Sequence, residues 1–230
     1  MNPTIARARS RARAAGVRLV PRELHSAGGA QAACYTFGMS AVTSPSVTTL
    51  EAWAALDEDD SRELVDGRLE DEEVPSAIHE AVVRWILVLL DAYFRPRGGL
   101  VFGSGIRLAV SARSGRSPDI VCYGPGRRPE ARGLVRVPPD VVVEVVSPSP
   151  RDERRDRIEK PDDYAVFGVR SYWIVDPDYR SFEVWELGAD KRYVRAAAGI
   201  QGKVERVPGF DGLSLDLDEL WAEVDRLEAP

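Results

Sequence analysis

The stretch Asp140-Val141-Val142-Val143-Glu144-Val145-Val146 decides the predicted fold. Valine on both faces of a strand is typical of a central strand that is covered on both sides. A second apolar run, Pro118-Asp119-Ile120-Val121-Cys122-Tyr123, begins with a proline, which is tolerated at the start of a strand. We expect these two runs to be neighbouring strands of one sheet.

The segments before these strands predict helices and a hairpin. Residues 76–95 predict a largely buried helix, because the polar residues form one stripe on an otherwise apolar cylinder. Asp66-Gly67 lies between two short alternating runs and predicts a tight hairpin, since both turn residues accept positive φ. Thr48 lies three residues before Glu51, as in a capping box, and predicts a short helix over 50–56.

The remaining segments complete an α/β pattern. Alternation over 106–110 and apolar runs over 172–176 and 182–187 predict three further strands. A helix is expected within 151–168, and another over 217–227 with Asp216 as its cap. This order predicts an α/β fold in which a mixed β-sheet is flanked by helices.

Composition excludes several classes of protein. The chain has 230 residues, of which 44% are apolar, enough for one good-sized core. The main helix candidate is uncharged only over 85–90, far short of a membrane span, so no membrane partner is expected. Two cysteines form no disulfide framework, and Cys122 lies in an apolar run, so we expect a cytoplasmic protein.

Charge is distributed unevenly along the chain. Residues 1–38 hold six arginines and one glutamate, a net +5, whereas the whole chain carries −6, so residues 39–230 carry −11. We predict a disordered, Arg-rich extension over 1–45 and a single domain over 46–230. The extension also suits a transit peptide, a basic nucleic-acid-binding arm, or upstream sequence before a true start at Met39. The acidic body is a poor general attractor for nucleic acid.

Two carboxylates stand out in the predicted sheet. Burying the charge of Glu144 costs about 3–5 kcal/mol unless the carboxylate is paired or binds a metal. Asp119 alone would more often be a turn residue, but it begins the neighbouring strand. Two carboxylates at the ends of adjacent strands form an oxygen-rich site suited to Mg²⁺ or Mn²⁺. The alternative is a structural ion pair between Glu144 and an arginine.

Three further residues are weaker candidates. Lys160 is one of three lysines against 28 arginines, which favours a role for a compact, movable ammonium, although a solvated helix residue is the alternative. His79 in the first turn of the long helix is a structural or capping residue, or an accessory site residue. Glu63 precedes the predicted hairpin and, by itself, does not indicate a functional role. One histidine without a cysteine cluster argues against a zinc site.

Two arginine clusters could attract nucleic acid or be solvated surface. The first lies in the loop over 124–138 and consists of Arg127, Arg128, Arg132 and Arg136. The second lies just before Lys160, is interleaved with acidic residues, and consists of Arg151, Arg154, Arg155 and Arg157.

The order and spacing of these motifs resemble the Uma-type endonucleases, a bacterial branch of the PD-(D/E)XK, or restriction-endonuclease-like, superfamily. The resemblance extends from Leu50 to Trp221. It rests on segments 63–69 (ELVDGRL), 76–79 (SAIH), 118–121 (PDIV), 142–149 (VVEVVSPS), 156–160 (DRIEK) with Tyr164, and 172–177 (YWIVDP).

The resemblance implies a metal-dependent endonuclease that hydrolyses phosphodiester bonds in DNA. Asp119 and Glu144 would bind Mg²⁺ or Mn²⁺, Lys160 would complete the catalytic set, and Glu63 would add a carboxylate. The superfamily's usual lysine position, two residues after the glutamate, is Val146 here, so Lys160 takes that role from the following helix. Pro161 suits a first helical turn and predicts a helix start near Lys160. By analogy, a homodimer is expected.

Two alternatives remain open at this point. One is a non-catalytic regulatory or interaction protein on a nuclease scaffold, because fold does not fix function. The other is a hydrolase of another phosphoester.

Overall fold

The computed structural model describes residues 48–57 and 60–229. The predicted extension over 1–45 and the alternative start at Met39 lie outside these residues. The helices are α1 (Leu50–Ala54), α2 (Ala77–Phe94), a short 3₁₀ turn η1 (Arg95–Arg97), α3 (Pro150–Arg154), a π-turn η2 (Arg155–Glu159), α4 (Lys160–Phe167) and α5 (Leu217–Glu228). The strands are β1 (Glu63–Val65), β2 (Arg68–Glu70), β3 (Leu100–Phe102), β4 (Ile120–Tyr123), β5 (Val141–Val145), β6 (Ser171–Asp176), β7 (Ser181–Leu187), β8 (Tyr193–Gly199), β9 (Lys203–Val204) and β10 (Leu215–Asp216).

A six-stranded sheet organises the fold. Its strand order is β3-β4-β5-β6-β7-β8, and β5 with β6 is the one parallel pair in it. The valine-rich run therefore becomes an inner strand, as predicted. β1 and β2 form a separate hairpin, in which Asp66 and Gly67 adopt the predicted positive φ of 49° and 79°.

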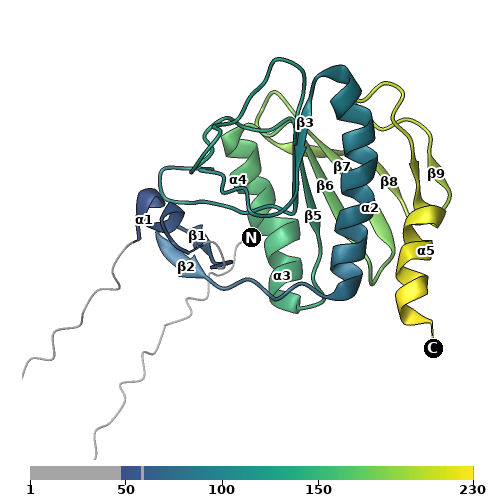
Figure 1. Cartoon of the computed structure of the whole chain (residues 1–230), viewed down its shortest axis with the longest axis horizontal. Coiled ribbons are helices and arrows are strands. Elements are labelled where there is room, and N and C mark those ends of the chain that lie inside the picture. Colours follow the sequence, from purple (N-terminus) through teal and green to yellow (C-terminus); the bar gives the residue numbers. More distant parts are fainter. Residues whose placement is uncertain (1–47, 58–59, 230) are drawn as a thin grey trace, which may run out of the picture. The chain divides into compact units, whose positions relative to one another are not determined.

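Helices cover both faces of this sheet (Figure 1). α2 and α5 pack on the face that carries Ile120, Val143 and Trp173. The opposite face carries Val121, Val142 and Tyr172 and packs against α4. Side chains alternate between these faces along each strand, so Asp119 and Glu144, in phase with Val121 and Val142, are directed to the α4 side. This confirms the predicted mixed sheet flanked by helices.

The predicted helix ends are largely confirmed. The Ser76 side chain accepts the backbone N–H of His79 at the start of α2, and Asp216 accepts that of Glu219 at the start of α5. For α1 the predicted cap was wrong by one residue. The capping side chain is Thr49, which accepts the N–H of Ala52 at 3.1 Å, whereas the Thr48 backbone N–H bonds to Gly67.

The predicted strand over 106–110 is wrong. Leu108 and Val110 are buried, as the alternation requires, but Leu108 makes only isolated bridges to Arg116 and Val135. The sheet instead gains β3 and β8, which the sequence pattern did not indicate. β3 has three residues, and β8 (YVRAAAG) is rich in alanine, which has a low strand propensity.

The segment 150–167 is one helical run in which a π-turn separates α3 from α4. α4 begins at Lys160 with Pro161 in its first turn, as predicted, but α3 and the π-turn extend the helical run back to Pro150. The Lys160 N–H donates to the carbonyl of Arg155, five residues earlier. Pro161 has no N–H to continue this pattern, which leaves the carbonyl of Asp156 without a helical donor. The Tyr172 hydroxyl donates to that carbonyl at 2.7 Å, which satisfies it from the sheet.

Among the residues that the structure describes, no helix has both the length and the apolar character to cross a membrane. Cys122 is a buried free thiol in β4, and burial raises its pKa well above the usual range.

Candidate functional site

A small pocket of about 60 Å³ lies at the end of β5 that is nearest to α3. Four of the five predicted site residues line it, namely His79, Asp119, Glu144 and Lys160. The antiparallel register pairs Ile120 with Val143, so the next step along the two strands sets Asp119 opposite Glu144. Asp119 Oδ2 accepts the backbone N–H of Val145 at 2.7 Å, which fixes this carboxylate against the neighbouring strand.

Glu144 is 2% exposed, and each of its carboxylate oxygens accepts one hydrogen bond. Its Oε1 accepts the Tyr164 hydroxyl at 2.6 Å, and its Oε2 accepts the Lys160 ammonium at 3.0 Å. The buried partner is thus a lysine, not the arginine of the structural alternative. Burial raises the pKa of Glu144 well above its usual range, against the opposing effect of Lys160 and with the help of nearby Asp119.

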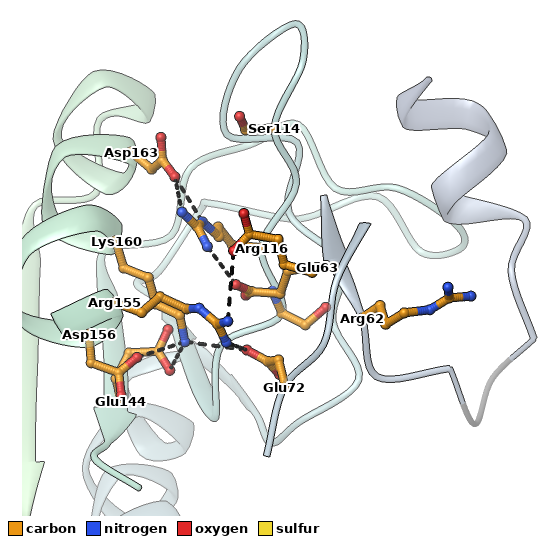
Figure 2. A network of polar contacts seen from close by, with 12 residues as sticks. Arg62, Glu63, Glu72, Ser114, Arg116, Glu144, Arg155, Asp156, Lys160 and Asp163 are labelled. Carbon is orange, nitrogen blue, oxygen red and sulfur yellow. Dashed lines mark hydrogen bonds and ion pairs between the residues drawn. The ribbon is translucent and has the colours of Figure 1, made fainter. Parts of the chain in front are cut away.

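Lys160 is buried among carboxylates (Figure 2). Its Nζ lies 3.0 Å from Glu144 Oε2, 3.0 Å from Asp156 Oδ1 and 3.6 Å from Glu72 Oε1. Burial by itself lowers a lysine pKa, but the carboxylates of Asp156 and Glu144 outweigh it and raise the pKa of Lys160 well above its usual range. The side chain is therefore a charged donor and not a base. The solvated-helix alternative is wrong.

His79 enters the pocket from the first turn of α2. Its Nε2 lies 3.4 Å from Asp119 Oδ2, and its Nδ1 has no hydrogen-bond partner among the described residues. Burial lowers the pKa of His79, but the Asp119 carboxylate outweighs this effect and gives a net increase.

Glu63 is behind the pocket wall and does not line it. It is completely buried, and its two oxygens accept the Arg116 guanidinium at 2.7 Å and the Ser117 backbone N–H at 2.8 Å. Arg116 Nη2 also lies 2.6 Å from Asp163 Oδ2 of α4. Arg116 therefore joins Glu63 to α4 (Figure 2). The cations Lys160 and Arg116 overcome the effect of burial and lower the pKa of Glu63. Glu63 thus fixes the segment that leads to Asp119.

Sequence analysis did not assign three residues of this cluster, Glu72, Arg155 and Asp156, to the site. Glu72 and Arg155 line the pocket beside Asp156, and Arg155 also donates to the Asp71 carbonyl at 3.1 Å. Burial, together with the Glu63 carboxylate, raises the pKa of Glu72 to about 7. The signals were an acidic run over 70–73 and the alternating charges over 151–159, but both patterns are also typical of solvated surface.

Several arginines of the two predicted clusters are engaged by other groups of the protein. In the second cluster, Arg155 is buried, and Arg157 is paired with Asp176 and Glu183, both at 2.8 Å. In the first cluster, Arg136 approaches Glu51 and Arg128 donates to the Gly98 carbonyl.

A wider groove of about 700 Å³ leads to this pocket and is acidic. It shares Glu72, Glu73, Asp119 and neighbouring residues with the pocket, and its further carboxylates are Asp60 and Glu80. Its arginine, Arg107, donates to backbone carbonyls from Trp53 to Asp60. A polyanion that enters this groove would therefore meet negative charge.

The donor set suits a hard divalent cation with few protein ligands. Within the described residues, no cluster of three or more His, Cys, Asp or Glu side chains is arranged to hold a metal ion. Asp119 and Glu144 offer two carboxylates, and no hydrogen bond or ion pair to Asp119 Oδ1 is found in this part of the chain. Mg²⁺ commonly keeps several waters and takes one or two carboxylates, so this pair fits it.

Comparisons with known proteins agree with this fold. A family model described as "Uma2: Putative restriction endonuclease" matches residues 47–218. A crystal structure described as a "putative nuclease belonging to DUF820 from Anabaena variabilis" aligns with a TM-score of 0.61 at 20% identity, over 76% of this chain and 98% of that chain. No curated protein matches the chain. The fold is that of the restriction-endonuclease-like nucleases, and since the family model covers most of its length, the chain belongs to the Uma2 restriction endonuclease family.

Proposed function

We propose that this protein is a metal-dependent endonuclease that hydrolyses phosphodiester bonds in DNA. One observation supports the proposal most strongly. Asp119 and Glu144 lie opposite each other on neighbouring strands, and the Lys160 ammonium lies 3.0 Å from Glu144. Two carboxylates and a buried cation in one pocket suit the chemistry of an anionic ester. Family membership supports the nuclease class.

Asp119 and Glu144 would hold Mg²⁺ or Mn²⁺. Such an ion, when bound, lowers the pKa of water and offsets negative charge on a phosphate. Asp119 is held in place by the Val145 N–H, and His79 Nε2 at 3.4 Å restricts its rotation. His79 is thus proposed as an accessory residue that orients the metal-binding carboxylate.

Lys160 would donate hydrogen bonds to a water or a phosphate oxygen. Because its pKa is raised, it stays charged and opposes the negative charge that develops during attack. Glu63 is proposed to act by position: its bonds to Arg116 and to the Ser117 N–H fix the chain two residues before Asp119.

The acidic groove favours one alternative, a hydrolase of a smaller phosphoester. Five carboxylates line the approach or its junction with the pocket, so DNA would have to bind against local repulsion. Both oxygens of Glu144 already accept a hydrogen bond from a protein side chain, which favours the other alternative, a non-catalytic protein on this scaffold.

One experiment separates these possibilities. The full chain is incubated with supercoiled DNA, single-stranded DNA and a small aryl phosphodiester, each with Mg²⁺, Mn²⁺ or chelator. Asp119→Asn and Glu144→Gln are compared with Asp178→Asn, which changes an exposed carboxylate that does not line the pocket. We expect DNA cleavage that needs metal, is lost in the first two variants and is kept in the third.

Cleavage of the small ester without cleavage of DNA would favour the smaller-substrate hydrolase. Full activity of Asp119→Asn would refute the assignment of the site. A folded protein that neither cleaves nor binds metal would favour the non-catalytic scaffold. A homodimer also stays a prediction, which light scattering in solution would measure.

A further inference from the structure

A second cavity lies at the other end of the sheet from the pocket just described. It measures about 820 Å³ and is bounded by the end of α2, the end of β4 and the starts of β5 and β6. Asp140 and Ser171 lie at these strand starts, whereas Glu144 and Val145 lie at the far end of β5. Five residues of strand separate the two ends by roughly 17 Å, so this cavity is not part of the candidate metal site.

Arginines from three separate segments face this cavity. They are Arg97 after α2, Arg127 in the loop after β4, and Arg170 before β6. Arg127 and Arg170 lie 3.5 and 3.7 Å from Asp140 Oδ1, longer than a tight ion pair, and Asp140 Oδ2 already accepts the Gly124 N–H at 2.7 Å. A guanidinium has five N–H donors, so these contacts leave donors that can bind an anion.

Aromatic rings form the adjoining wall. Tyr93 and Phe94 of α2 each contact Phe210 at an angle, with ring centroids 6.1 and 5.8 Å apart. The Arg97 guanidinium lies 3.9 Å from the centre of the Tyr93 ring. Planar side chains of this kind stack against flat aromatic ligands.

Two carboxylates complete the lining. Asp140 lies beside the arginines, and Glu186 is exposed near the end of β7. Carboxylates accept hydrogen bonds from the amino groups of nucleobases, and arginines bind phosphate with two parallel bonds.

We propose that this cavity binds a nucleoside phosphate, with the phosphate on the arginines and the base against Phe210 and Tyr93. The volume is within the range of small-molecule sites. The ligand has two sources, a free nucleotide or the terminal nucleotide of a single DNA strand. The proposal goes beyond the proposed hydrolysis and does not depend on it, because binding here requires neither metal nor Asp119.

The test is calorimetric titration of the full-length Asp119→Ala protein in the presence of chelator. The probes are deoxycytidine monophosphate, deoxyguanosine monophosphate, deoxycytidine, inorganic phosphate and a 5′-phosphorylated hexanucleotide. Arg127→Gln/Arg170→Gln removes two cations from the cavity. Arg195→Gln/Arg226→Gln is the matched control, since it removes two exposed, ion-paired arginines elsewhere.

We expect at least one nucleotide probe to bind more tightly than phosphate or deoxycytidine. The cavity variant should weaken that binding by about tenfold or more, and the control should not. Arg170→Gln alone, at a side chain that is 74% exposed, should weaken binding in a protein whose fold is undisturbed.

Tighter binding of the hexanucleotide than of the mononucleotides would identify the strand end as the source, and the reverse would identify the free nucleotide. Absence of nucleotide binding would overturn the proposal, as would equal affinity for inorganic phosphate or an unchanged affinity in the cavity variant. Loss of DNA cleavage in Asp119→Asn with nucleotide binding intact would leave both proposals standing, and each can fail separately.

Discussion

Replacement of Arg116 by leucine tests the buried charge network most directly. Arg116 is 1% exposed, and Glu63 is completely buried. Loss of the guanidinium leaves the Glu63 carboxylate with the Ser117 N–H but without its cation at 2.7 Å. Removing one partner of a buried ion pair costs about 3–5 kcal/mol. With a urea dependence of about 2 kcal/mol/M, the unfolding midpoint should fall by about 1.5–2.5 M.

The assay is urea unfolding followed by fluorescence of the five tryptophans. Arg113→Leu is the matched control, because Arg113 belongs to the same loop but is exposed and donates to the Asp66 carbonyl. A surface change of this kind should stay within about 0.5 kcal/mol. Equal midpoint shifts in the two variants would refute the argument that the pair stabilises the fold.

The pH dependence of Arg116→Leu provides a second check on the same reasoning. The pKa of Glu63 is lowered in the folded protein, so its stabilisation is present above the ordinary glutamate pKa and is lost as pH falls through the folded value. In the variant, protonation relieves the unpaired carboxylate. The stability difference between the two proteins should therefore narrow as the pH falls to about 4. A constant difference would contradict this assignment.

Three further predictions concern the site. Tyr172→Phe should destabilise the protein by about 1–3 kcal/mol, because the Asp156 carbonyl loses its hydrogen-bond donor. Pro161→Ala restores a backbone N–H at this turn, so it should reduce the cost of Tyr172→Phe in a double-mutant cycle measured by thermal or urea unfolding. The pKa of Glu72 is raised to about 7, so without metal the wild type should lose stability as pH rises from the ordinary glutamate range through about 7; Glu72→Gln should flatten that slope, and parallel slopes would contradict it. Mg²⁺ at about 100 times its Kd should raise Tm by about 5–10 °C in calorimetry, and an equal rise in Asp119→Asn would show that the ion binds elsewhere.

The sequence located the strands of the site because their signals are local. A carboxylate in a valine run at Glu144, and another at the start of an apolar strand at Asp119, each conflict with burial and so mark a site. The Asp66-Gly67 turn was equally predictable, since few residue pairs accept its two positive φ angles. These features depend on residues that are near one another along the chain.

Arg116 shows why the long-range contacts around the site were not predictable from the sequence. It lies in the segment 111–117, which is rich in serine and reads as a polar loop, yet its side chain is buried between Glu63 and Asp163. Both partners are about fifty positions away in sequence, and nothing local marks the contact. The strand predicted over 106–110 was wrong for the same reason. The alternation of the segment indicates which residues are buried, but not which other segment pairs with it.

The π-turn over Arg155–Glu159 sets the rotational phase between α3 and α4. One residue corresponds to about 100° around a helix, so an uninterrupted α-helix from Pro150 would direct Lys160 about a quarter-turn away from Glu144. The π-turn holds one residue more than an α-helical turn, and this additional residue directs the Lys160 ammonium toward Glu144. A protein of this fold that lacks that single residue should be aligned with a one-position gap here, and its lysine should be sought at a different helical position.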